Sequence, residues 1–152
     1  MYSPDEKYGH ILMLEERWWV KFNEYAKTGK KIHAHVRAGI AGPKRTTLVF
    51  FYAIYPVMEI KGYGDFIERV AGDSKELWDL YHNETCLESY DQYRKLIGMR
   101  ESATFIRFKN LHEGMNSIPF SKISEILGIK RMPRKGRYVN EQESSEFIKL
   151  LG

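Results

Sequence analysis

One stretch of the sequence, residues 25–53, constrains the fold of this chain more than any other. It reads YAKTGKKIHAHVRAGIAGPKRTTLVFFYA and places a helix end, a basic turn, a strand, a glycine-containing loop and a second strand in close succession. Residues 32–37 alternate strictly between apolar and polar side chains, which predicts a strand with one buried face and one polar face. Residues 46–53 are β-branched and aromatic, which predicts a strand covered on both faces. We expect the rest of the chain to complete and cover this hairpin-like unit.

Helices are predicted where apolar side chains recur at helical spacing behind a capping residue. Asp73, Thr85 and Asn140 each precede a glutamate by three residues, which is the spacing of a capping box. The predicted helices are residues 15–27, a pair that begins at 73 and at 85, residues 121–127 and residues 140–151. Further strands are predicted at residues 10–13, 57–70 and 103–111, and two glycines inside the second of them predict a bend.

This order of elements predicts an α+β fold with a bent mixed β-sheet, or pseudo-barrel, flanked by helices. The strands do not alternate regularly with helices, which argues against a doubly wound parallel sheet. No repeat, low-complexity tract or long linker divides the 152 residues, so we expect a single domain over residues 1–152. Its core should span about residues 10–139, followed by the C-terminal helix at about 140–151.

Composition excludes several classes of protein. Hydrophobic residues make up 43% of the chain, and no apolar run approaches the roughly 20 residues that a membrane helix requires. The N-terminal residues MYSPDEKYGH contain no apolar signal-peptide core, so we expect a cytoplasmic protein without a membrane partner. Cys86 is the only cysteine, which excludes an intramolecular disulfide, and we expect it to be a semi-buried apolar side chain. Without a phosphate-loop, dinucleotide or zinc signature, we expect no cofactor and no bound metal.

The basic residues are segregated from the acidic ones, within a formal net charge of +4. Acidic residues crowd into 73–91 and 141–146, which predicts one basic face elsewhere on the molecule. Lysines and arginines beside exposed backbone amides suit phosphate oxygens, and a cationic loop adds salt-sensitive affinity for phosphate backbones. An ordinary solvated surface is the alternative for each basic segment. The candidate nucleic-acid-binding residues are Lys30, Lys31, Arg37, Lys44, Arg45, Lys130, Arg131, Arg134, Lys135 and Arg137.

Two histidines and several aromatic residues complete the candidate site. His33 and His35 share the polar face of the first predicted strand of the unit, where we expect them to line a cleft. They could also share a metal, although the spacing provides no third ligand, or act as a general acid–base pair in RNA cleavage. Trp19, Tyr52 or Tyr63 could stack on an unpaired base in the same cleft, with core packing as the alternative for each.

Several patches of the sequence, taken in order, match a known pattern. They are EERWWVKFNEYAKTGKK, TTLVFFYA, IKGYGDFIERV, DSKELWDLY with SYDQYRKLIG, ATFIRFKNL, and PFSKI with MPRKGRYV. Together they resemble the PUA-like superfamily, and within it the ASCH-type domains and a related uncharacterised archaeal family. The resemblance spans about residues 10–139, and the order and spacing of the patches are more specific than any one of them.

The resemblance implies a PUA-like fold and a cleft near the Gly29–Lys31 turn that binds RNA or a modified base. Some ASCH-type proteins are enzymes, including an amidohydrolase that acts on an acylated cytidine and a ribonuclease. Their motif continues after the lysine with an acidic residue and an arginine. Here Ala34 or a neighbouring histidine occupies the acidic position, and the register to Arg37 slips by about one residue. The resemblance therefore carries over Lys31 and Arg37, but no catalytic carboxylate.

We therefore expect RNA to be the partner of this chain, in particular a structured or modified species bound by the basic residues. A small hydrolase acting on a nucleoside or RNA is the alternative hypothesis, and a protein-interaction module is the third. The sequence indicates neither catalytic residues nor an oligomeric state.

Overall fold

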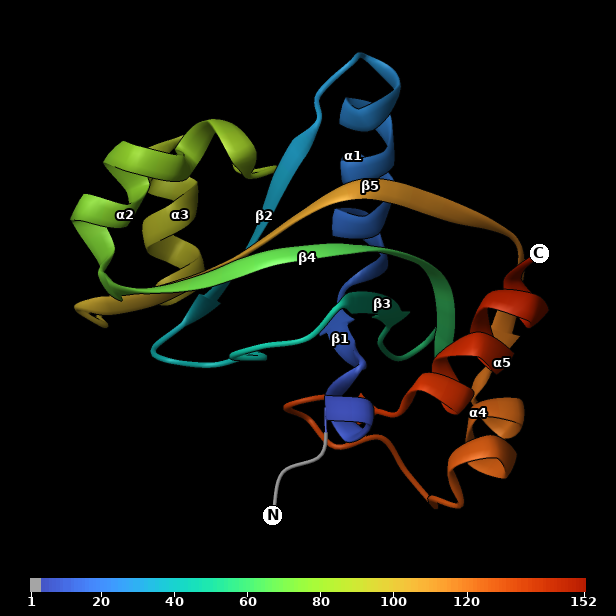
Figure 1. The fold of residues 1–152 in the computed structure, drawn as a ribbon. Coiled ribbons are helices and arrows are strands. Elements are labelled where there is room, and N and C mark those ends of the chain that lie inside the picture. The colour runs from blue at the N-terminus through green and yellow to red at the C-terminus, as the bar shows by residue number, and fades with distance from the viewer. Residues whose placement is uncertain (1–3) are drawn as a thin grey trace.

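Six β-strands form one mixed sheet with five α-helices around it in the computed structural model, which describes residues 4–152 and the side chains from Glu6 onward (Figure 1). The strand order is β2-β5-β4-β3-β1-β6, with β1 and β3 parallel and the other neighbours antiparallel. The expected α+β class is therefore confirmed. The strands are β1 (Gly9–Leu14), β2 (Ile32–Ala38), β3 (Leu48–Ala53), β4 (Glu59–Asp73), β5 (Ser102–Pro119) and β6 (Arg137–Val139). The helices are α1 (Glu16–Lys27), α2 (Ser74–Tyr81), α3 (Tyr90–Ile97), α4 (Phe120–Leu127) and α5 (Glu141–Leu151).

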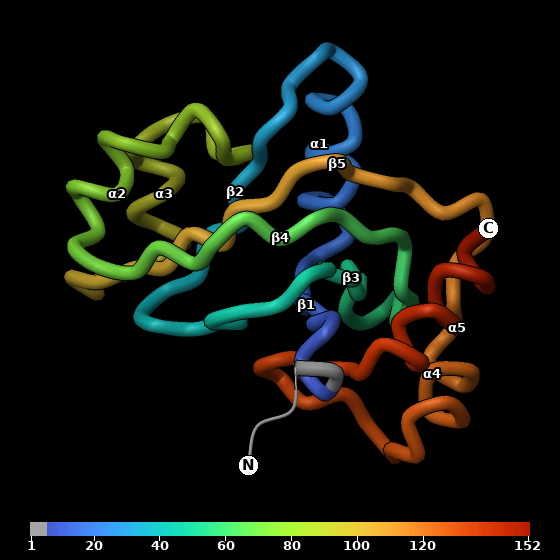
Figure 2. The backbone as a smooth tube through the Cα atoms, in the orientation of Figure 1, coloured from blue at the N-terminus to red at the C-terminus, as the bar shows by residue number. Residues whose placement is uncertain are grey.

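The two longest strands, β4 and β5, run together and bend at the same end of the sheet (Figure 2). Their pairing register shifts around Gly62. A Cβ atom at Gly62 would overlap the carbonyl oxygen of His112 and the ring of Trp19, so glycine lets the two strands approach closely at this point. The long bent strand predicted at residues 57–70 is confirmed.

Helix α1 lies behind β4 and β5 in Figure 1 and packs on β3 and β5. Both of its adjacent tryptophans are buried, with Trp18 8% and Trp19 3% exposed. Trp19 packs on Phe51 of β3 with ring centroids 5.1 Å apart, while Trp18 shares a small cavity with Val36 of β2 and Leu96 of α3. The expectation that Trp19 offers a surface for a base is therefore wrong, because neighbouring elements cover two sides of α1 and enclose both rings.

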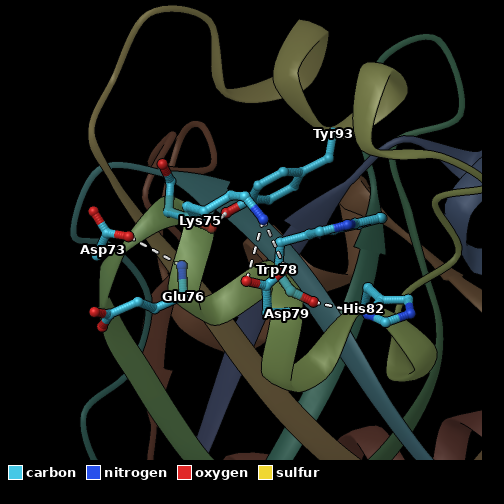
Figure 3. A network of polar contacts seen from close by, with 8 residues as sticks. Asp73, Lys75, Glu76, Trp78, Asp79, His82 and Tyr93 are labelled. Carbon is cyan, nitrogen blue, oxygen red and sulfur yellow. Dashed lines mark hydrogen bonds and ion pairs between the residues drawn. The ribbon is translucent and has the colours of Figure 1, made fainter.

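Helices α2 and α3 pack together at one end of the sheet (Figure 1). A cap begins α2, and ring stacking joins it to α3 (Figure 3). The Asp73 carboxylate accepts a hydrogen bond from the backbone N–H of Glu76 at 3.0 Å, as its position in the sequence predicts. Tyr93 of α3 stacks on Trp78 of α2 with ring centroids 4.8 Å apart. At the end of α2, Nδ1 of His82 donates to the carbonyl of Trp78 at 2.9 Å. The ring stack joins α2 to α3, and the two helices pack as one unit beside β2.

Two element boundaries differ most from the prediction. Helix α3 begins after Ser89, whose hydroxyl accepts the capping hydrogen bond at 3.1 Å. Thr85, the predicted cap, instead donates its hydroxyl hydrogen to the carbonyl of His82 at 2.8 Å. Strand β5 continues past the predicted residues 103–111 as far as Pro119, because its second half still pairs with β4.

The C-terminal part returns the chain to β1 through the basic loop, which we define as residues 128–136. The loop ends in β6, a short strand that the sequence pattern did not predict. Gly136 has a φ of 73°, and a Cβ there would overlap the carbonyl oxygen of Ile11, so the position requires glycine. Helix α5 starts with the predicted capping box of Asn140 and Glu143. Within the described residues, no helix is long and apolar enough to cross a lipid bilayer.

Candidate functional site

The polar face of β2 carries the predicted residues but is largely closed to water. His33 is 1% exposed and His35 8%, because Phe22 of α1 lies over both rings with centroid distances of 5.7 Å and 6.3 Å. Phe108 of β5 stacks on His33 at 5.4 Å. Arg37, at the end of the strand, is only half-buried. The face therefore opens toward solvent at its Arg37 end.

A cleft of about 570 Å³, which we call the Arg37 cleft, opens at this end of β2. It lies among the end of β1, the start of α1, the end of β2, α3 and the basic loop. Arg37 and Arg134 both line it, so the two basic segments of the sequence meet here. The apolar part of its wall is formed by Met13, Leu14, Trp18, Ile54, Leu96 and Met132.

Arg37 is a half-buried cation without an acidic partner. Among the described residues, its guanidinium forms no hydrogen bond or ion pair. Burial lowers the pKa of Arg37, yet the group stays charged at pH 7 because arginine's ordinary pKa is above 12. Burial, together with this charge, lowers the pKa of His10 to about 4 and of His35 to about 3. A desolvated cation that no carboxylate neutralises favours the binding of an anion.

The other charges around the cleft leave it positive. The guanidinium of Arg17 lies over the ring of Trp18 at 4.4 Å, and its Nε donates to the Glu15 carboxylate at 2.6 Å. Among the described residues, Glu15 is the one acidic side chain that lines the cleft, and it forms an ion pair with Arg17. Arg134 is exposed and, within residues 6–152, has no ion-pair partner. The cleft therefore suits a ligand that combines an anionic group with an apolar ring.

Both histidines are neutral side chains at pH 7, because burial lowers their pKa values. Burial is the main cause of the low pKa of His33, about 4, and the charge of Lys30 lowers it further. General acid–base catalysis works best with a pKa near the operating pH, which neither His33 nor His35 provides. In the described part of the chain, no group of three or more His, Cys, Asp or Glu side chains could hold a metal ion.

A second basic depression, of about 320 Å³, lies beside the β2–β3 loop. We call it the Lys44 depression; it is lined by Lys7, Lys44, Arg45 and Tyr138. The ring of Tyr138 meets His10 edge-on at 4.9 Å, and His10 lies within reach of the charge of Arg37. The Tyr138 hydroxyl accepts a hydrogen bond from the backbone N–H of Lys44 at 3.0 Å, which ties the β2–β3 loop to β6.

The turn between α1 and β2, where the resemblance placed the cleft, lies at the opposite end of β2 (Figure 2). A depression of about 520 Å³ there is lined by Lys30, Lys31, His33 and Lys109, among other residues. The Lys30 ammonium points at the carbonyl of Thr85, 3.5 Å away. At about 3.3 Å per strand residue, Lys31 and Arg37 are roughly 20 Å apart. The two residues therefore belong to different sites rather than to one cleft.

The remaining basic candidates lie outside these three depressions. Lys130, Arg131 and Lys135 are exposed on the basic loop, which also carries Arg134. Arg137 is half-buried in β6, and its Nε donates to the carbonyl of Tyr138 at 3.4 Å. The structure thus gathers Arg37 with Arg134, Lys44 with Arg45, and Lys30 with Lys31, and leaves the other predicted cations outside these three depressions.

Tyr52 does not line a binding surface, contrary to expectation. It is 2% exposed, and burial raises its pKa, because both faces of β3 are covered. Cys86 is a free, buried thiol whose pKa burial raises to about 12. Sequence reasoning missed His10 and Tyr138, which face each other because β1 pairs with β6. It also missed Arg17, for which the neighbouring Trp18 at a helix start was the available signal.

No protein-family model matches the sequence, and no curated protein matches it either. The crystal structure of ASCH from Zymomonas mobilis matches with a TM-score of 0.75 at 21% identity, over 95% of this chain and 96% of that chain. Its variant with a serine replaced by alanine matches with a TM-score of 0.76 at 20% identity, over 96% and 98%. A variant with a tyrosine replaced by phenylalanine gives 0.75 at 22%, over 94% and 98%. The chain thus has the fold of these Zymomonas mobilis ASCH structures, as the resemblance implied.

Proposed function

We propose that this chain binds RNA and that the Arg37 cleft holds one unpaired nucleotide of it. The observation that carries the proposal is Arg37 itself, a half-buried guanidinium with no acidic partner among the described residues. A phosphate in the cleft neutralises this charge and fits the two-pronged geometry of a guanidinium. Arg134 adds a second cation from the basic loop.

The apolar wall supports a nucleotide over a simple anion. The cleft volume of about 570 Å³ falls within the roughly 300–1,000 Å³ that is usual for small-ligand sites. Met13 and Met132 supply adaptable apolar surface, and Ile54 adds a further apolar contact. Unpaired nucleotides in single-stranded RNA present both an apolar ring and a phosphate, and proteins recognise them in this way.

The test is binding of labelled cellular RNA fragments, with random-sequence DNA as the control, across a salt series. We expect tighter binding to RNA and a steep loss of affinity with salt. Arg37→Gln should weaken binding by about tenfold or more, because hydrogen bonds to charged groups contribute about 1.5–3 kcal/mol. The exchange removes a cation without stranding a carboxylate, since Arg37 has no acidic partner in the described chain. Lys149→Gln, an exposed cation on α5, is the matched control and should bind like the wild type.

Absence of RNA binding at low salt would refute the proposal, as would equal binding by Arg37→Gln and Lys149→Gln. Two further outcomes would favour the other hypotheses drawn from the sequence. Release of nucleoside products, lost in a folded His35→Ala or Lys31→Ala variant, would identify a hydrolase. A protein partner that binds regardless of the basic residues would identify an interaction module.

A further inference from the structure

The Lys44 depression has the character of a second phosphate site. Lys44 and Arg45 are exposed, and among residues 6–152 no acidic side chain lines the depression with them. Their side chains have no ion-pair partner within residues 6–152. Tyr138, which completes the lining with Lys7, adds a phenol ring that meets the ring of His10 edge-on.

The backbone of the β2–β3 loop, which carries these two cations, is anchored before any ligand binds. The Thr104 hydroxyl donates to the carbonyl of Gly39 at 2.6 Å and accepts the N–H of Ala41 at 3.1 Å. Beyond this anchor, the N–H of Lys44 donates to the hydroxyl of Tyr138 at 3.0 Å. A loop anchored in this way loses little conformational entropy on binding, which favours affinity.

A pair of rings links the two sites. Tyr138 lines the Lys44 depression, and its ring centroid lies 4.9 Å from that of His10, which is within reach of the charge of Arg37. His10 is 4% exposed and neutral at pH 7, since its pKa is lowered to about 4. Among the described residues that line the two sites, Glu15, which is paired with Arg17, is the one carboxylate that could repel a chain of phosphates.

We infer that the ligand is a single RNA strand bound across both sites, with one nucleotide in the Arg37 cleft and a neighbouring phosphate on Lys44 and Arg45. The inference rests on the proposed function and adds the class of ligand: an oligonucleotide strand rather than a free nucleotide. A regular duplex does not fit the arrangement, because its bases are stacked and paired and cannot enter the cleft.

The experiment compares two probes, a random-sequence RNA octamer and the four ribonucleoside 5′-monophosphates, on the full-length chain. Lys44→Glu/Arg45→Glu is the test variant, and Lys95→Glu/Lys149→Glu, an equal charge change at two exposed lysines on α3 and α5, is the matched control. The test variant should weaken octamer binding by about tenfold or more relative to the control. Its salt slope should be shallower by about 1.4, or 0.7 for each of two lost phosphate contacts on a single strand. Monophosphate binding should be equal in the two variants.

Arg37→Gln separates this inference from the proposed function, because it should weaken the binding of both probes. If the test variant and the control bind the octamer equally, the two-site inference is refuted, while a loss in Arg37→Gln preserves the proposed function. An equal loss of octamer and monophosphate in the test variant also refutes it, since Lys44 and Arg45 would then act on the cleft itself. If the wild type binds neither probe at low salt, both ideas fail.

Discussion

His33 is a buried neutral side chain whose replacement should change how stability depends on pH. Its ring packs between Phe22 and Phe108, and burial, helped by the charge of Lys30 and opposed by Glu84, lowers its pKa from 6.5 to about 4. Because the folded pKa is below the unfolded one, the unfolded chain binds more protons in acid. The stabilisation is therefore complete above about pH 6.5 and is lost as the pH falls toward 4. Between pH 7 and pH 5, the loss for one such histidine is about 2 kcal/mol.

His33→Phe should remove this contribution while keeping a ring between Phe22 and Phe108. Urea unfolding at pH 7 and pH 5, followed by tryptophan fluorescence, gives the free energy of unfolding of each protein at each pH. The wild type should lose about 2 kcal/mol more than the variant over this interval. His112→Gln, at an exposed histidine, is the matched control and should keep the wild-type loss. Equal losses in the wild type and His33→Phe would show that His33 accepts its proton in the folded state as readily as in water, which would refute the reasoning.

Three further predictions concern the elements around the site. In the urea assay, Gly136→Ala should lower the free energy of unfolding by more than about 2 kcal/mol, because the new Cβ meets the Ile11 carbonyl at a positive φ. Gly29→Ala is the comparison: its φ is 100° but the space around it is open, so this variant should lose only about 1 kcal/mol. Asn140→Ala should lose about 1 kcal/mol by removing the cap of α5, and an unchanged urea midpoint would contradict this. Lys31→Glu should have a smaller effect than Arg37→Glu on both RNA affinity and its salt slope, since Lys31 lies at the other end of β2. A larger effect of Lys31→Glu in the salt series would place the binding site at the other end of β2.

The local structure of this chain could be predicted from its sequence because it depends on neighbours in the sequence. The capping box at Asn140 and the cap at Asp73 are interactions across three residues, and both form as predicted. The apolar character of residues 46–53 predicted the fully buried strand β3, and glycines predicted the bend in β4. The resemblance added the overall fold, which the match to the Zymomonas mobilis structures confirms.

The short strand β6 and the burial of the adjacent tryptophans could not be predicted in this way. β6 is three residues long and forms only because β1 offers it an edge to pair with. Trp19 and Tyr52 were candidates for a binding surface, yet elements distant in the sequence cover them. Apolar periodicity predicts that one face of a helix or strand is buried, but it does not predict how many neighbouring elements will cover a given residue.

The sequence alone determined which residues are basic, which segments are strands and helices, and that the cations fall into two groups. Only the tertiary structure decided that Arg37 meets Arg134 in one cleft while Lys31 lies at the far end of the same strand. It also placed His10, which lies within reach of the charge of Arg37, against Tyr138 of the Lys44 depression. The physical reason is that strand order and sheet curvature follow from burying the whole apolar surface at once. The grouping of charges around a cleft therefore depends on contacts between segments that are remote in the chain.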